Sequence, residues 1–399
     1  MTEYTGFNRV KYLPYCLSIL IIISTLPGSI VSQGLLHLGE VKIQVVQSIY
    51  FLLILVLSFV YIGKNYFDKI ALIPTHMYIV VLVYVVQIII SAIFHDIFIL
   101  ATVVLQGLSL VIYFATYKSI KRRVFLNVLY GVVVLILVVF VINLLMIKIG
   151  WLNPFDEIVT SSLYVLEDNT LSYNYFYGKY FCLITPLNLL YPETGNILIY
   201  FNEPHNLHFF LIPSLLLLWH FQYYGYRILT VLYIALYAHS VSITTLIVFF
   251  LLFLLISYRT VVLILLITMP AMLFVPKSGL FRILMYKLFE DNSSLVHSLE
   301  RQQELFLSFS SAGEGVWMID MLEGDGAGFI TSFLLIVFVI IVIQRWWSLY
   351  TSHRFLFMAF GYVFLHGFKI YNAFYTSVFP ILYLSIILDL GKSESIKDN

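Results

Sequence analysis

Long apolar segments recur along the whole chain and limit what it can fold into. Each run is rich in Leu, Ile, Val, Phe and Tyr and approaches the length that crosses a hydrocarbon layer about 30 Å thick. Hydrophobic residues make up 61% of the chain and charged residues 11%, and mean hydropathy is +0.96. Soluble domains carry about 25% charged residues. The sequence therefore predicts an all-α, polytopic integral membrane protein whose residues 1–399 form a single transmembrane domain.

About twelve transmembrane helices are expected from these runs. The paired runs on either side of residues 239–241 and of residues 366–372 are short for a full crossing, and merging either pair would invert the topology downstream. The predicted spans are residues 12–31, 43–62, 77–94, 97–117, 125–147, 206–223, 228–240, 242–257, 261–275, 329–343, 355–367 and 373–389.

The distribution of charge predicts the orientation of these spans. If the N-terminus lies inside, most lysines and arginines fall on the inside and most carboxylates on the outside, as the positive-inside rule requires. The clearest marker is the segment KSIKRR, residues 118–123, which we interpret as a topology signal; an anionic-lipid patch is the alternative. We therefore expect both termini to be cytoplasmic.

Two large extracytoplasmic loops follow from this topology, over residues 148–203 and 276–328. Each is about fifty residues long, far beyond the usual connection, and loops of such length are either disordered or functional. The first is rich in Tyr, Phe and Leu, a composition that suits either anchoring at the bilayer interface or stacking against sugar rings. No Asp, Glu, Lys or Arg falls in the middle of a predicted span, which argues against an ion-coupled transporter and places any chemistry at the outer surface.

The end of the first loop supplies one group of candidate catalytic residues. Glu203, His205 and His208 stand directly ahead of an apolar run, where polar groups are costly. In a helix that starts near His205, the two imidazoles are three residues apart and share a face. The alternative is an ordinary helix start, with Pro204 in the first turn and Glu203 near the positive helix end.

The second loop supplies a group of cationic and glycine residues. Arg282, His297 and Arg301 lie in a stretch whose apolar residues have helical spacing, and Gly313 and Gly315 open a glycine-rich segment. The glycines form no Walker loop, and a flexible turn is their alternative interpretation. We expect no metal site, because the acidic residues of this loop match no ligand pattern.

The layout resembles the Wzy-type O-antigen and capsule repeat-unit polymerases, in the O-antigen ligase and polymerase superfamily. The resemblance covers almost the whole chain and rests on twelve spans, inside termini, two enlarged outer loops, the FNEP segment before the sixth span, and an Arg, Gly-rich and Asp-Gly segment before the tenth. Several family members have an Arg followed by a Gly at fixed spacing in both loops. Here Arg301 to Gly313 is longer by one residue, and the first loop has no Arg.

This resemblance implies a glycosyltransferase of the bacterial inner membrane that polymerises oligosaccharide repeat units linked to undecaprenyl pyrophosphate, in lipopolysaccharide or other surface polysaccharide biosynthesis. The sugar hydroxyl that attacks needs a general base, for which Glu203 and His205 are the candidates. The departing pyrophosphate needs cations, which Arg301 and Arg282 supply. Expected partners are lipid-linked oligosaccharides, membrane lipid and a chain-length regulator, with no cofactor and no nucleic acid.

Three other functions remain open on the sequence alone. An O-antigen ligase has the same general layout, but its acceptor is the lipid A core. A flippase for the same lipid-linked unit has a similar span count, but it needs a cationic cavity within the bundle, and the predicted spans are apolar at their centres. The third alternative is a structural or assembly partner without chemistry.

Overall fold

The computed structural model describes a mostly helical protein, as the sequence predicts. The described residues are 12–26, 43–62, 116–117, 120–155, 158–165, 171–177, 183–185, 195–199, 201, 204–240, 242, 245–246, 248–249, 251–252, 340, 343–344, 346–347, 349–350, 353–369, 386–387 and 389. Among them the long helices are α1 (Leu13–Thr25), α3 (Ile43–Ile62), α7 (Arg122–Ile149), α8 (Pro204–His220), α9 (Tyr226–Ala238) and α16 (Arg354–Lys369).

Each of these six helices coincides with a predicted span. The helix α3 has the predicted bounds. The other five differ from prediction at both ends, by one to three residues except at the end of α1, which stops at Thr25 rather than at residue 31. The remaining six predicted spans lie wholly or largely outside the described residues. Of the helices that can be described, α7 alone is long and apolar enough to cross a membrane. Its most apolar 18-residue stretch has a mean hydropathy of 3.1, and 28% of that stretch is buried inside the protein.

The helix α7 shows how the sequence sets its bounds and faces. It begins after Lys121, whose backbone is extended, and ends at Gly150, which adopts the left-handed conformation that glycine tolerates (φ 80°). The backbone N–H of Gly150 bonds the Ile147 carbonyl at 3.1 Å, and that of Trp151 bonds the Met146 carbonyl at 2.9 Å. These bonds satisfy carbonyls that the helix end would leave without partners.

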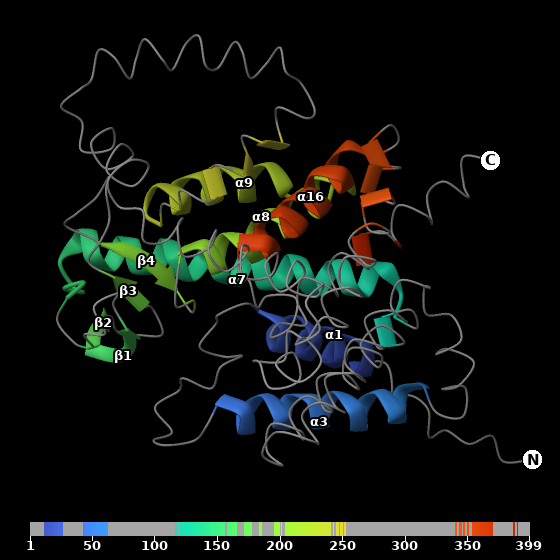
Figure 1. Ribbon diagram of the computed structural model, residues 1–399, viewed down its shortest axis with the longest axis horizontal. Coiled ribbons are helices and arrows are strands. Elements are labelled where there is room, and N and C mark those ends of the chain that lie inside the picture. Colours follow the sequence, from blue (N-terminus) through green and yellow to red (C-terminus); the bar gives the residue numbers. More distant parts are fainter. Residues whose placement is uncertain are drawn as a thin grey trace, which may run out of the picture.

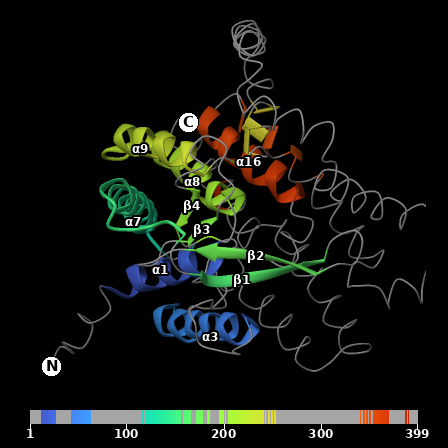
Figure 2. The same ribbon diagram turned by 90° about the vertical axis from the view of Figure 1, so that its left-hand side faces the viewer.

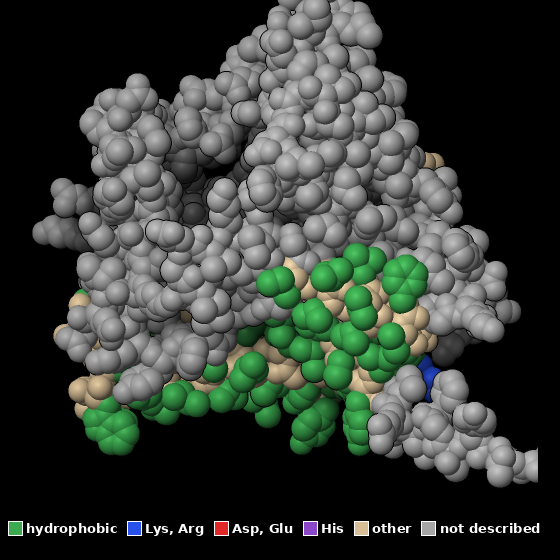
Figure 3. All heavy atoms as spheres, turned by 90° about the horizontal axis from the view of Figure 1, so that it is seen from below, with side chains coloured by type: hydrophobic (Ala, Val, Ile, Leu, Met, Phe, Trp, Pro, Cys, Tyr) green, Lys and Arg blue, Asp and Glu red, His purple; other side chains and the backbone are tan. Residues whose placement is uncertain are grey.

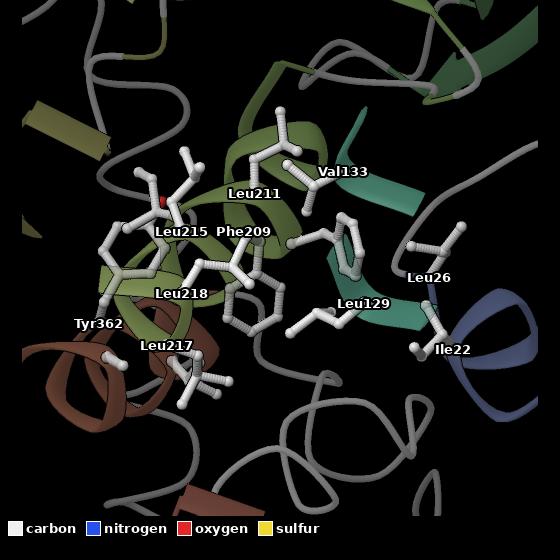
Figure 4. Close-up of a cluster of buried hydrophobic side chains, with 14 of the residues drawn as sticks. Ile22, Leu26, Leu129, Val133, Phe209, Leu211, Leu215, Leu217, Leu218 and Tyr362 are labelled. Carbon is white, nitrogen blue, oxygen red and sulfur yellow. The ribbon is translucent and has the colours of Figure 1, made fainter. Parts of the chain in front are cut away.

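The helix α8 lies at the centre of the described structure. It packs most extensively against α16 and also contacts α7, α9 and the last strand of the sheet. Viewed end-on, α7 and α9 lie on one side of α8 and α16 lies on the other (Figure 2). Figure 4 shows the resulting core, in which residues of α1, α7, α8 and α16 meet. The labelled members are Ile22, Leu26, Leu129, Val133, Phe209, Leu211, Leu215, Leu217, Leu218 and Tyr362.

A four-stranded antiparallel sheet corrects the all-α prediction. Its strands β1 (Ile158–Val165), β2 (Leu171–Tyr177), β3 (Leu183–Thr185) and β4 (Asn196–Ile199) follow one another in sequence order within the first large loop. In Figure 1 this sheet lies beside the end of α7 from which the loop departs. Tyr, Phe, Val, Ile and Thr are the residues that favour strands, and they are also common in apolar segments at a membrane interface.

The described helices keep their charged residues at their ends and expose apolar side chains along their lengths. On α7 the exposed side chains recur three or four residues apart, so they form one stripe. Seen from below, where α3 lies, the described surface is largely apolar (Figure 3). The exposed residues are Ile49, Leu52, Leu53, Val56, Phe59 and Val60 on α3, Leu135, Val138, Ile142, Leu145 and Ile149 on α7, and Ile228, Val231 and Ile234 on α9.

The start of α7, the end of α8 and the starts of α9 and α16 meet at one end of the described bundle. The Arg122 guanidinium lies 4.9 Å from the centre of the Phe221 ring, and Tyr223 donates a hydrogen bond to the Asn127 side chain. The rings of His220 and His353 lie 5.4 Å apart. This end therefore combines aromatic rings with the basic residues that begin three of the helices.

Close packing around Gly361 of α16 predicts that this position admits no side chain. A Cβ atom there would lie 2.5 Å from Trp346 Cζ2 and 2.5 Å from Leu252 Cδ2. Trp346 cannot easily move, because its Nε1 donates to the Phe357 carbonyl at 2.9 Å and its ring stacks on Phe357. We expect Gly361→Ala to lower stability by about 1–3 kcal/mol, as overpacked cores do, and to lower Tm in detergent.

The matched control is Gly131→Ala on α7, where an added Cβ meets nothing within 4 Å. Alanine favours a helix over glycine by up to about 1 kcal/mol, so Tm should stay constant or rise. Equal Tm changes in the two variants would contradict the described packing of α16.

Candidate functional site

Four histidines gather at the other end of the bundle, where α8 begins and where α9 and α16 end. We call His205, His208, His239 and His366, together with the hydroxyl-bearing residues that contact them, the histidine cluster. It lies next to the sheet, because the backbone N–H of Ile197 on β4 donates to the His239 carbonyl at 2.8 Å. The cluster thus joins the first large loop to three helices.

His208 is fully buried and is held by hydrogen bonds at both ring nitrogens. Its Nε2 lies 2.5 Å from the Ser240 carbonyl, and its Nδ1 lies 3.1 Å from the Tyr233 hydroxyl. Because a carbonyl oxygen only accepts, Nε2 carries the proton and Nδ1 accepts from Tyr233. His208 is therefore a neutral tie between α8 and the end of α9, and neither nitrogen is left for a reaction.

The turn after α9 is fixed by a set of hydrogen bonds around this tie. The Ser240 hydroxyl donates to the Leu236 carbonyl at 2.9 Å, and the Tyr237 hydroxyl donates to the Ser242 carbonyl at 2.8 Å. The Tyr237 ring also lies 4.7 Å from the His208 ring. The turn is thereby held against α8, which keeps the buried hydrogen bonds of His208 in place.

His205 differs from His208 because it is half-buried and faces a different helix. It lies in the first turn of α8, one residue after Pro204. Its ring centre lies 5.8 Å from that of His366, near the end of α16. His205 therefore combines partial exposure with a fixed aromatic neighbour, which suits a group that exchanges a proton with a bound molecule.

His366 is itself part of a row of stacked rings. It is fully buried, and it stacks on Phe209 with ring centres 4.8 Å apart and planes 19° apart. The Tyr362 ring lies 5.3 Å from it on the same helix. The Tyr362 hydroxyl in turn lies 3.2 Å from the Thr245 hydroxyl. This row fixes the end of α16 against the start of α8.

Of the predicted site residues, His205 and His208 lie within the described part of the chain. The predicted base Glu203 and the second-loop residues Arg282, Arg301, His297, Gly313 and Gly315 all fall outside it. Their distances from His205 therefore remain predictions.

The predicted shared face of His205 and His208 resolves into two separate environments. Although the two residues are three apart on α8, His205 contacts α16 and His208 contacts α9. Sequence reasoning also missed His366, Tyr362 and Tyr233. His366 could have been noticed in the sequence, because it is an imidazole near the end of an otherwise apolar run and such a polar group needs a partner.

The described residues hold no group of three or more His, Cys, Asp or Glu side chains that could bind a metal ion. The imidazole and hydroxyl groups of the histidine cluster can form hydrogen bonds and transfer protons.

Comparison with known proteins gives no match: no family model, no curated protein and no solved structure corresponds to this chain.

The His208 tie can be tested by removing one hydroxyl. Tyr233→Phe leaves the buried Nδ1 of His208 without its donor, which should cost about 1–3 kcal/mol and lower Tm in detergent. Tyr224→Phe is the matched control, because Tyr224 is 86% exposed and the same change there should have little effect. A Tm for Tyr233→Phe equal to that of Tyr224→Phe would show that the hydroxyl does not hold His208.

Proposed function

We propose that the chain is a polytopic membrane glycosyltransferase that joins oligosaccharide repeat units carried on undecaprenyl pyrophosphate. The observation that carries the proposal is His205, a half-buried imidazole in the first turn of α8, held beside the sheet that the first large loop forms. Transfer of a glycan to a sugar hydroxyl requires a group that accepts the hydroxyl proton. In the proposed orientation His205, at the start of α8 and next to the first large loop, is such a group.

The pattern of exposed side chains supports the membrane part of the proposal. Burying a Leu, Ile or Val side chain is worth roughly 1.5–3 kcal/mol in water, and α3, α7 and α9 leave many such side chains uncovered. In a bilayer, lipid tails contact these apolar side chains, so the free-energy cost of exposing them to water is avoided. The charged residues of α7, α9 and α16 lie at their ends, which supports the proposal because charged side chains favour the depth of lipid headgroups.

The arrangement of helix ends supports the proposed orientation. Arg122, Phe221 and His353, which the predicted topology assigns to the cytoplasmic side, meet at one end of the bundle. His205, Ser240 and His366, which it assigns to the outer side, meet at the other. We propose that the first end faces the cytoplasm, with both chain termini, and that the second faces outward in a bacterial inner membrane.

The proposed reaction transfers a growing glycan to the nonreducing-end sugar of a lipid-linked repeat unit. The acceptor hydroxyl loses its proton to His205 or Glu203 as its oxygen forms a bond to the anomeric carbon of the donor. The bond from that carbon to the pyrophosphate oxygen breaks, and undecaprenyl pyrophosphate leaves with the electron pair. On this proposal Arg301 and Arg282 hold its charge, and the glycine-rich segment with Gly313 and Gly315 approaches the phosphate oxygens.

The proposal can be tested by changing His205 in the purified protein. We expect His205→Gln to abolish the lengthening of synthetic undecaprenyl-pyrophosphate repeat units, with Tm close to that of the wild type, because glutamine cannot take up the hydroxyl proton. General-base catalysis typically supplies about 10²–10⁴-fold in rate, so the product ladder should be lost from a gel.

His220→Gln is the control, because this imidazole belongs to the opposite end of the bundle. It should leave elongation intact. Wild-type protein that does not lengthen the repeats would contradict the polymerase function, and a wild-type rate for His205→Gln would contradict the assignment of His205 as the base.

A deletion strain distinguishes the polymerase from the alternative ligase. Loss of a polymerase leaves single capped repeats, whereas loss of a ligase leaves none.

A further inference from the structure

The ring of His366 lies between two residues of α8 and one residue of its own helix. Phe209 stacks on it at 4.8 Å, His205 lies 5.8 Å away with the planes 37° apart, and Tyr362 lies 5.3 Å away. These separations fall within the range of direct aromatic contact. His366 is therefore the part of α16 that lies against the imidazole to which the proposed function assigns proton transfer.

The position of His366 is fixed by neighbours on several segments. Tyr362 is one turn earlier on α16, is fully buried, and has its hydroxyl 3.2 Å from that of Thr245. Phe249 lies 5.5 Å from the Tyr362 ring. The segment after α9 thus holds Tyr362, Tyr362 packs on His366, and His366 packs on His205.

A half-buried side chain in the first turn of a helix can adopt several rotamers, and only some of them aim its ring nitrogen at a bound hydroxyl. A flat buried ring beside it removes part of that freedom. Catalytic groups held in this way by packed neighbours react faster, because little reorientation is left to do in the transition state.

We propose that His366 is a positioning residue that orients the imidazole of His205 through the shape of its ring. The proposal rests on the proposed function, since it assigns His366 a role only through His205. It makes the planar ring of His366 the required feature, rather than either of its nitrogens.

The test compares His366→Leu with His366→Phe in elongation of synthetic undecaprenyl-pyrophosphate repeats by the purified full chain. Leucine removes the flat ring, so kcat should fall about 10- to 100-fold, the cost of a catalytic group misplaced by about 1 Å, while KM stays within about twofold. Phenylalanine keeps the ring, so its kcat should stay within about threefold of the wild type. A loss with His366→Phe as large as with His366→Leu would overturn the proposal.

A double variant separates positioning from a general structural role. If His366 acts through His205, then adding His366→Leu to His205→Gln should cause no further loss of the residual rate, whereas independent effects would multiply. Multiplying losses would overturn the proposal. If His205→Gln itself keeps the wild-type rate, the proposed function of His205 fails; if only His366→Leu keeps it, this inference alone fails.

Should His366→Leu not fold, Tyr362→Leu tests the same row, because it removes the ring that lies 5.3 Å from His366 and supports it. We then expect kcat to fall about two- to fivefold at constant KM. An unchanged kcat would overturn the proposal.

Discussion

Buried serine and threonine hydroxyls in the described part of the chain bond to the backbone or to one another, and the packing of the bundle depends on this constraint. Hydroxyls and an amide bond back to the carbonyl four residues earlier, as Ser18, Asn143, Ser214, Thr230 and Ser240 do. Thr116 and Ser58 bond each other at 2.7 Å between separate segments. In the proposed bilayer no solvent replaces a lost partner, so such internal bonds are the arrangement that lipid requires.

This constraint divides the polar chemistry of the bundle between its two ends. At one end Arg122 of α7 and Arg227 of α9 lie against aromatic rings, where water and headgroups would solvate them in the proposed setting. At the other end the hydrogen bonds and ring contacts of the histidine cluster tie α8 to α9, to α16 and to β4. His205 alone among its four histidines is not deeply buried. The cluster therefore combines a rigid interior with one imidazole open to a reactant.

The six long helices in the described part of the chain were predicted from the sequence because apolar length is a local property. The bounds of α3 coincide with the apolar run between Lys42 and Gly63, whereas α7 extends past the predicted residues 125–147 through Arg122, Arg123 and Lys148 and stops at Gly150. The sheet was missed because the strands of a tyrosine-rich loop and an unstructured interfacial loop have similar composition. The role of His208 could not be predicted, since its partners Tyr233 and Ser240 are 25 and 32 residues away. His205 could be named as a candidate from the sequence, whereas its contact with His366 depends on how α16 packs against α8.

The central claim is that the two polar ends of this bundle face opposite sides of a membrane, and labelling of single cysteines tests it most directly. With Cys16 and Cys182 replaced, Trp151→Cys and Tyr224→Cys place thiols at residues that are 78% and 86% exposed, at the end of α7 beside the sheet and in the turn between α8 and α9. We predict that a membrane-impermeant maleimide labels Cys at position 151 in intact cells, and Cys at position 224 only after permeabilisation. Labelling of both from the same side would contradict the claim.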